Sequence, residues 1–283
     1  MAKQIVHLSD NMISFNGPVN TSAGATVSET PTSVKCYIYD EHKETRTCEF
    51  VTRLSTFSSV SDVGITVPKF DPQPFEVGDT VVLTQDDGSL HTTTVASIGT
   101  GDPKFDTITV NNGTAVAAAA GSKFVLKTKV LGMTKMVVPV GVKLEVGDAV
   151  EILQDDLSDH PTTVSQVQKI VALEDAGSGT ATTALNQDTF MCVTLGGATT
   201  DAVTANSRMR RPVGSVIDLI KFGTFPTSNP IPGDSSWGFR AVIPDTHPDL
   251  VVGMTVRIEV RFNGGAELML IKSAICGVVE DVL

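Results

Sequence analysis

The sequence predicts an all-β protein built from tandem small β-barrels, with an extended N-terminal arm and a hairpin ahead of them. Three observations lead to this fold class: a long internal repeat, short β-branched segments separated by turn residues, and abundant threonine and valine without a long helical stretch. The repeat is considered first because it fixes the architecture of the chain. The 283 residues are 41% hydrophobic but only 5% aromatic, so we expect cores made mainly of Val, Ile, Leu and Ala.

The repeat is clearest between residues 75–95 (FEVGDTVVLTQDDGSLHTTTV) and 144–164 (LEVGDAVEILQDDLSDHPTTV). These segments align without a gap at an offset of 69, and 13 of the 21 positions are identical. Farther along the chain the offset becomes 85, which places a 16-residue insertion near 174–185, where EDAGSGTATTAL is typical of an exposed loop. A fainter third copy, LVVGMTVRIEV at 250–260, lacks the Asp-Asp pair and the His.

Each copy indicates several short strands. The Gly-Asp pair in VGDTVVL marks a turn, because glycine adopts a positive φ without a Cβ penalty, and a β-branched run follows it. Residues 92–98 and 107–110 are also β-branched and lie between clusters of turn-forming residues, which is the pattern of strands. A few strands cannot bury a core as a flat open sheet, so we expect each copy to close into a small barrel, which also removes exposed edges.

In chain order the sequence divides into six segments. They are an extended arm rich in Ser, Thr, Asn and Gly (1–33), a β-hairpin with a linker (34–64), the first barrel repeat (65–135), the second barrel repeat (136–211), a Pro/Gly-rich connection (212–236) and a C-terminal β unit with the weak third repeat (237–283). Alternating residues near the start of the arm predict one short strand there. The apolar ending VVEDVL predicts that the last strand is tied into a sheet.

The predicted hairpin contains two of the four cysteines. Cys36 and Cys48 are symmetric about a turn expected near residues 41–43, so the two sulfur atoms could face each other. They are either joined in a disulfide or are two reduced, half-buried thiols, and the second interpretation is favoured because thiols of cytosolic chains stay reduced. The chain has no CxxC pair, so the spacing excludes a zinc ribbon.

Composition narrows the classes of partner. The net charge of −11 argues against a general nucleic-acid binder, because phosphate contacts require clustered Lys and Arg. No 18-residue apolar run is present, so no membrane-spanning segment is predicted. The first residues, MAKQIVHLSDNMISF, contain no apolar core of a signal peptide, so secretion through a cleaved signal is not expected.

Duplicated acids and histidines are the strongest candidates for chemistry. They are Asp86, Asp87 and His91 in the first copy and Asp155, Asp156 and His160 in the second. Such acids could hold a divalent cation, but calcium needs six to eight oxygens, and adjacent side chains of a strand point to opposite faces. The favoured interpretation is a polar turn in which Asp caps backbone amides. We therefore predict no catalytic, cofactor-binding or metal-binding residues and no cofactor.

One dense basic group stands out in this acidic chain. Arg208, Arg210 and Arg211 lie close together in the segment RMRR, which could meet an acidic partner surface, although a solvated strand end is the favoured interpretation. No nucleophile elbow, zinc-protease, Walker or Rossmann pattern occurs.

The first repeat also resembles a known class of module. Its pattern FEVGDTVVL…TTTVASI…DTITV…AGSKFVL resembles the small β-barrel modules of tailed-bacteriophage virion proteins, where a VGDxVxL stretch opens the module and an AGSxxV stretch closes it. The second repeat departs at the closing stretch, where it has Ala205-Asn206-Ser207, so only its opening carries the resemblance. The resemblance covers 65–211 and extends weakly to 237–283.

The resemblance implies a non-enzymatic structural role in a virion, for a protein made in the host cytoplasm. Within that class we expect a capsid decoration or cement protein that is lattice-bound or homo-oligomeric and clamps the major capsid protein or other virion subunits through its arm and barrels. We expect no nucleic-acid or membrane partner. The alternatives are a collar, tail or fibre subunit, a glycan-binding adhesion module, which one Trp and two Tyr weaken, and, ranked last, an enzyme with scattered site residues.

The arm is expected to provide the attachment. Its apolar residues are small, so burying them on its own domain returns little against roughly 1–2 kcal/mol of backbone entropy for each ordered residue. Adding a strand to the sheet edge of a neighbouring subunit would supply backbone hydrogen bonds. We therefore predict that residues 1–33 bind a neighbouring subunit.

Overall fold

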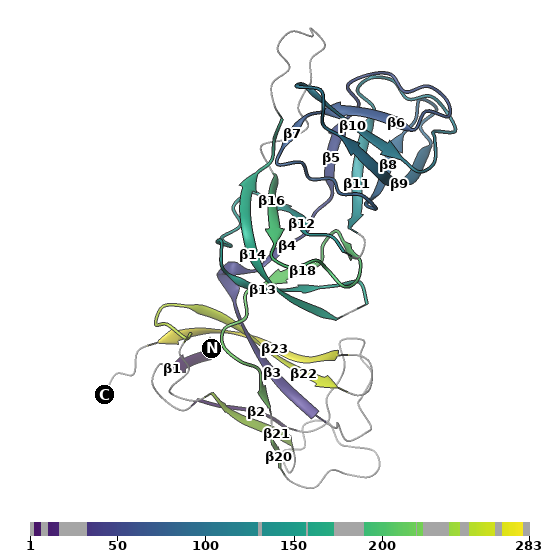
Figure 1. The fold of residues 1–283 in the computed structure, drawn as a ribbon. Coiled ribbons are helices and arrows are strands. Elements are labelled where there is room, and N and C mark those ends of the chain that lie inside the picture. The colour runs from purple at the N-terminus through teal and green to yellow at the C-terminus, as the bar shows by residue number, and fades with distance from the viewer. Residues whose placement is uncertain are drawn as a thin grey trace, which may run out of the picture. The chain divides into compact units, whose positions relative to one another are not determined.

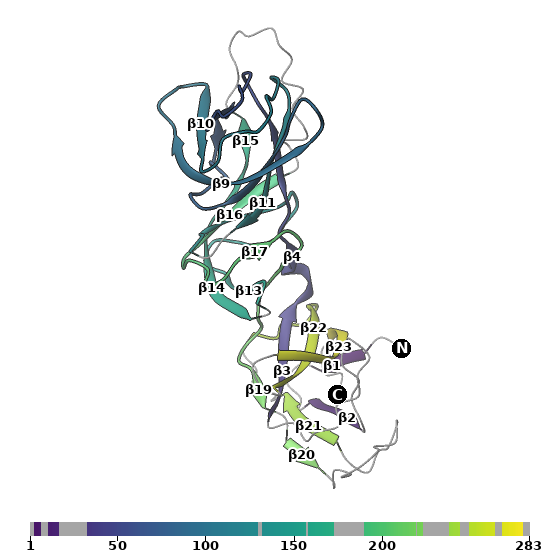
Figure 2. The same ribbon diagram turned by 90° about the vertical axis from the view of Figure 1, so that its right-hand side faces the viewer.

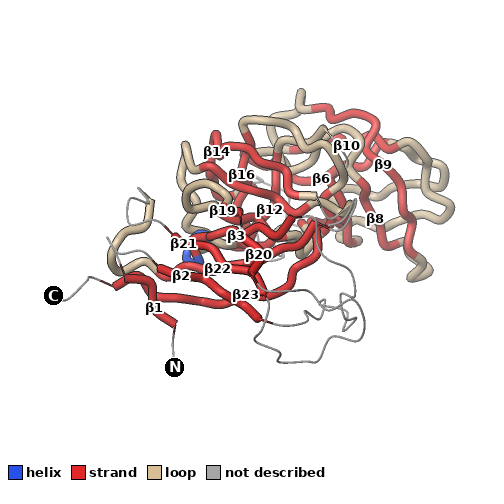
Figure 3. Tube along the Cα trace, turned by 90° about the horizontal axis from the view of Figure 1, so that it is seen from below, coloured by secondary structure: helices blue, strands red, loops and turns tan. Residues whose placement is uncertain are grey.

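The computed structural model describes residues 3–6, 11–16, 33–129, 132–156, 158–172, 190–218, 220–222, 238–243, 249–263 and 268–279. Apart from one 3₁₀ turn, η1 (Glu41–Lys43), every regular element in these ranges is a β-strand (Figures 1 and 3). The chain forms two compact units, which we call the central unit (residues 45–209) and the terminal unit (residues 1–44 and 210–283). The all-β prediction is confirmed.

The central unit contains both barrel repeats. The strands of the first repeat are β5 (Phe50–Arg53), β6 (Gly64–Pro68), β7 (Phe70–Asp71), β8 (Thr80–Thr84), β9 (Leu90–Gly99), β10 (Phe105–Val110) and β11 (Lys123–Lys129). Those of the second are β4 (Thr45–Arg46), β12 (Lys135–Pro139), β13 (Ala149–Leu153), β14 (Asp159–Lys169), β15 (Val171–Ala172), β16 (Phe190–Leu195), β17 (Val203–Thr204) and β18 (Arg208–Arg210).

The two repeats have the same strand order. The first sheet runs β6-β10-β9-β8-β11-β5, and the second runs β12-β16-β14-β13-β18-β4. The first curls into a nearly closed barrel and the second into a half-barrel, as Figure 1 shows. Tandem small barrels, predicted from the sequence repeat, are therefore confirmed.

The strands that close these two sheets come from one segment before both repeats. In the first repeat, Ser55 N donates to Thr66 O (2.8 Å) on β6, beyond the end of β5. In the second, Cys48 N donates to Val137 O (2.9 Å) on β12, beyond the end of β4. Residues 45–55 thus supply the sixth strand of each repeat in succession.

This segment was expected to be half of a hairpin, and that prediction is wrong. Residues 33–40 do form a strand, β3 (Ser33–Asp40), and a turn follows at η1, but β3 pairs with β22 (Thr255–Asn263) in the terminal unit. The second half of the expected hairpin becomes β4 and β5 of the central unit. Cys36 and Cys48 therefore lie in different units, and both are free thiols.

A tight turn with a glycine at positive φ precedes the central strand of each copy. Gly78, Gly147 and Gly253 have φ values of 97°, 94° and 91°. Their amides donate to the carbonyl oxygens of Val95, Val164 and Val278 over 2.7, 2.8 and 2.9 Å. The turn recurs in all three places because a residue with a Cβ would be strained at this φ.

The two repeats share part of one hydrophobic core. Phe50 of β5 is fully buried and meets the rings of Phe70, Phe75 and Phe190 edge-on, with centroids 5.1–5.7 Å apart. Phe190 belongs to the second repeat, as do Val137 and Cys192 of the same cluster. Strand pairs β7–β15 and β11–β17 also join the repeats. The repeats are therefore packed together.

The terminal unit is assembled from both ends of the chain. Its five-stranded sheet has the order β1-β23-β22-β3-β19, and a three-stranded sheet has the order β2-β21-β20 (Figure 2). The additional strands are β1 (Lys3–Val6), β2 (Asn11–Asn16), β19 (Ile217–Asp218), β20 (Ile220–Phe222), β21 (Gly238–Ile243) and β23 (Leu268–Val279).

The expected arm is therefore wrong for the part of residues 1–33 that the structure describes. β1 pairs in parallel with β23, and β2 pairs antiparallel with β21, so both stretches add strands to sheets of their own chain. The backbone hydrogen bonds that were assigned to a partner come from the C-terminal strands. The predicted short strand near the start and the strand near the end are both present. Residues 7–10 and 17–32 lie outside the described part.

Candidate functional site: the polar joint between the two repeats

The duplicated acids are used to hold turns together. Asp87 Oδ1 accepts hydrogen bonds from Ser89 N (2.9 Å) and Ser89 Oγ (2.6 Å), and Asp156 does the same with Ser158 at identical distances. These hydrogen bonds lower the pKa of both Asp87 and Asp156, and the bond from the serine hydroxyl has a larger effect than the bond from the serine amide. The capping interpretation is confirmed for these two acids.

The preceding acids bind the segment that lies between β10 and β11 in the first repeat and between β16 and β18 in the second. Asp86 Oδ1 accepts from Ala119 N (2.7 Å), and Asp155 Oδ1 accepts from Thr204 N and Thr204 Oγ1 (both 2.9 Å). Sequence reasoning missed the glutamine just before each pair. Both glutamines are buried, and each ties its turn to the same loop: Gln85 through Val116 N, and Gln154 through Thr200 N and Asp201 N.

The histidines are not gathered into a reactive group. His91 Nε2 lies 2.9 Å from Asn112 O, whereas His160 is half-buried in β14 opposite Ile152. Across the described ranges, no three His, Cys, Asp or Glu side chains come together as a potential metal site.

Burial raises the pKa of the Cys36 and Cys48 thiols to about 12, which keeps both thiols protonated at neutral pH.

The basic segment RMRR is not a solvated strand end. Arg210 is buried and Nη1 donates to Glu259 Oε2 (2.8 Å), with the guanidinium 4.1 Å from the centre of the Tyr39 ring. Arg211 reaches Asp40 Oδ2 at 3.5 Å.

The two tyrosines considered for a sugar platform, Tyr37 and Tyr39, lie in this arginine cluster with their rings nearly parallel. Tyr39 is buried, and the guanidinium of Arg261 lies 4.4 Å from the centre of the half-buried Tyr37 ring.

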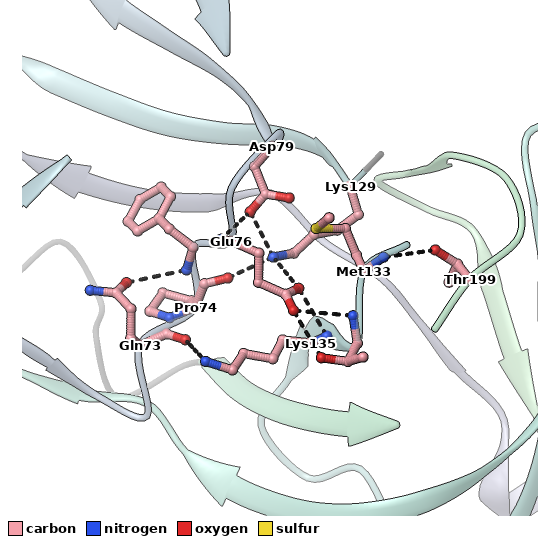
Figure 4. Close-up of polar contacts among 10 residues, drawn as sticks. Gln73, Pro74, Glu76, Asp79, Lys129, Met133, Lys135 and Thr199 are labelled. Carbon is pink, nitrogen blue, oxygen red and sulfur yellow. Dashed lines mark hydrogen bonds and ion pairs between the residues drawn. The ribbon is translucent and has the colours of Figure 1, made fainter. Parts of the chain in front are cut away.

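A dense group of polar contacts among the described residues of the central unit lies where the two repeats meet (Figure 4). Lys129, at the end of β11, has only 5% of its surface exposed. Its Nζ donates to Asp79 Oδ2 (2.7 Å), Pro74 O (2.7 Å) and Glu76 Oε2 (3.2 Å). We call Lys129, Asp79 and Glu76 the joint triad.

Glu76 connects this triad to the start of the second repeat. Its Oε1 accepts from Thr134 N (3.1 Å) and Thr134 Oγ1 (2.9 Å), and its Oε2 accepts from Lys135 N (3.0 Å). Lys135 Nζ in turn donates a hydrogen bond to Gln73 O of the first repeat (3.0 Å). A carboxylate of the first repeat therefore fixes the backbone from which β12 of the second begins.

The two acids of the triad have opposite pKa shifts. Burial raises the pKa of Asp79 and outweighs the charge of Lys129 beside it. Burial also acts on Glu76, but Lys129 and the donors from Lys135 and Thr134 outweigh it and lower the pKa of that carboxyl. The opposite shifts make Asp79 the easier of the two carboxylates to protonate.

The joint triad is absent from the second repeat. Glu145 and Asp148 stand at the positions of Glu76 and Asp79, and Asp148 Oδ2 caps Glu145 N (2.8 Å) as Asp79 Oδ2 caps Glu76 N (2.7 Å). In the alignment of the two repeats, however, the position equivalent to Lys129, 85 residues farther along the chain, is occupied by Gly214. That substitution is the one sequence signal that could have revealed the triad.

Comparison with known proteins adds no relative to this description: no protein-family model, no curated protein and no solved structure matches the chain. No helix within the described residues has the length and apolar character needed to cross a membrane. Any functional assignment therefore depends on the geometry of the chain itself.

Proposed function

We propose that this chain is a non-enzymatic structural protein of a phage virion, and that it decorates or cements the capsid by binding neighbouring shell subunits. The supporting features are two packed barrels with a shared core and duplicated polar residues that are engaged in internal hydrogen bonds. Its partners are protein subunits, the major capsid protein foremost, rather than nucleic acid or membrane. It acts bound to the lattice or as a homo-oligomer.

The observation that carries this proposal is a set of three exposed apolar side chains at the loop end of the first repeat. Phe57, Val60 and Leu90 are 59%, 58% and 67% exposed, and we call these three residues the apolar loop end. Ser58 exchanges backbone hydrogen bonds with Ala118 (2.8 and 2.9 Å), so the loop that carries Phe57 and Val60 is tied to the barrel. A contiguous exposed apolar area marks a protein-binding surface, and we propose that these three side chains contribute to one.

The loop end of the second repeat shows what kind of surface can bind the loop end of a barrel. Val203 stands at the position of Ala118, and it pairs with Lys129 of the first repeat, so this end contacts another barrel. Asp159 replaces Leu90 there. In the described part of the chain, no barrel covers the corresponding end of the first repeat, and we propose that a shell subunit does.

A virion assay tests the role and the surface together. Phage that lack the gene would be complemented with the natural chain, with a Phe57→Ser/Leu90→Ser variant, or with Val146→Ser, which changes an exposed valine elsewhere. We expect the natural chain and Val146→Ser to co-purify with particles and the double variant to be lost from them, with unchanged circular dichroism. Incorporation of the double variant at the natural level would reject the apolar loop end as the attachment surface.

Immunogold labelling of the same particles separates the placements. Regular label over the shell supports decoration or cement. Label at the neck, tail or fibres supports the alternative placements, and absence of the protein from purified particles overturns the virion role.

A further inference from the structure

The joint triad places an amine and a carboxyl group directly opposite each other on neighbouring strands. β8 and β11 are antiparallel with Thr80 opposite Thr128, so Asp79 and Lys129 face each other one residue farther on. Directly opposed residues have Cβ atoms about 5 Å apart, a distance that an extended lysine spans. The lysine Nζ is already 2.7 Å from Asp79 Oδ2.

Both groups are shielded from water. The Asp79 side chain is fully buried, and its second oxygen, Oδ1, receives no hydrogen bond from any described residue. Two acids surround one lysine here, so an all-ionic triad buries an uncompensated negative charge, which is costly in a site that excludes water. A reaction between Lys129 and Asp79 leaves that net charge unchanged but replaces two buried charges by a neutral amide, and the remaining charge of Glu76 keeps its donors from Thr134 and Lys135.

We propose that Lys129 and Asp79 form an intramolecular isopeptide bond, with Glu76 relaying the proton. Glu76 Oε2, 3.2 Å from Nζ, relays one proton from the Lys129 ammonium to the Asp79 carboxylate, and the free amine then attacks Cγ of the neutral carboxyl. The C–N bond forms, Glu76 takes the second proton from the nitrogen and gives it to the departing hydroxyl, and the C–OH bond breaks to release water. Starting from ammonium and carboxylate, the products are one amide and one water, so no oxidant or activating reagent is required.

The surroundings favour this reaction over hydrolysis. The reacting atoms are held by the folded sheet, and well-oriented intramolecular reactions reach very high effective concentrations. Burial raises the pKa of Asp79, which favours transfer of a proton to this carboxyl, and the lowered pKa of Glu76 favours its release of a proton that it has accepted. The bond would close a covalent ring from residue 79 through β8, β9, β10 and β11 to residue 129. The second repeat, with Gly214 in place of the lysine, forms none.

Mass spectrometry of the denatured, reduced full-length protein tests the proposal. The natural chain should be lighter than its sequence by one water, and digestion should yield one branched peptide that joins Lys129 to Asp79. The matched control Lys129→Arg keeps the positive charge but should show its full sequence mass. Asp79→Asn should lose ammonia instead of water and reach the same product mass as the natural chain.

The relay is tested by Glu76→Gln, with Glu145→Gln in the second repeat as its control. We expect the branched peptide to fall at least tenfold in Glu76→Gln and to be unchanged in Glu145→Gln. If the natural chain, folded and incubated for days, retains its full mass and gives only linear peptides, the isopeptide bond does not exist. A water loss that maps to another residue overturns the assignment equally.

Discussion

The two repeats of the central unit are alike in backbone and differ at their ends. Both have the same strand order, the same glycine turn, the same Gln-Asp-Asp-x-Ser turn and the same closing contact from residues 45–55. They differ at the base, where only the first has Lys129 beside its two acids, and at the loop end, where Leu90 stands in one and Asp159 in the other. The shared residues build the barrel, and the unshared residues determine what each barrel joins.

The largest effect on stability is expected from replacing Lys129, which has no counterpart in the second repeat. Lys129→Met leaves Asp79 and Glu76 buried without their cation, and where the amide has formed it removes that bond as well. Loss of one member of a buried ionic group costs about 3–5 kcal/mol of folding free energy. Hydrogen exchange of the β8–β11 amides at increasing urea concentrations measures the loss locally.

The control for Lys129 lies two residues away on the same strand. Lys127 pairs with Glu49 at 2.6 Å, but both side chains are 41% exposed. Lys127→Met should therefore cost no more than about 1 kcal/mol. Equal effects of the two substitutions would show that the joint triad is no more than a surface ion pair.

The next largest effect should come from a residue that both repeats share. Gln154→Ala strands the amides of Thr200 and Asp201, and Gln85→Ala strands that of Val116, in buried turns. An unsatisfied buried group costs about 1–3 kcal/mol, so we expect both variants to lose stability, with the larger loss in Gln154→Ala. Exchange of the β13–β14 and β8–β9 amides reports each repeat separately. The exposed Gln166→Ala should change stability by less than about 0.5 kcal/mol, and a larger change would discredit the comparison.

What could be read from the sequence was the part that repeats. The 13 identities predicted two equivalent barrels, and the paired aspartates were correctly interpreted as turn caps. The hairpin at 34–64 was wrong because a local turn signal does not specify a long-range partner, and β3 finds β22 more than 200 residues away. The buried Arg210 was missed because an arginine that pairs with Glu259 looks the same in sequence as a solvated one.

A smaller effect should come from the glycine turns. Gly78→Ala, Gly147→Ala and Gly253→Ala each force a Cβ into a left-handed conformation, which costs about 1–2 kcal/mol. Around Gly147 and Gly253 no atom lies within 4 Å of the added Cβ, so at these two the backbone strain acts alone. Equal losses at these two positions, measured by exchange of the Val164 and Val278 amides, extend the comparison to the third copy. A negligible loss at Gly253 would show that its turn is not equivalent.

The smallest expected difference is electrostatic and separates the otherwise identical serine turns. Ser89 supplies the hydrogen bonds that lower the pKa of Asp87, and Ser158 does so for Asp156, whose pKa the neighbouring Asp201 lowers further. A carboxyl whose folded pKa is depressed stabilises the fold above its unfolded pKa and loses that contribution as pH falls through the folded pKa. Ser89→Ala should therefore return the Asp87 pKa toward its usual value of 3.8 further than Ser158→Ala returns that of Asp156. Carboxyl chemical shifts followed by NMR between neutral and acid pH measure both values, and equal shifts in the two variants would show that Asp201 contributes nothing to this turn.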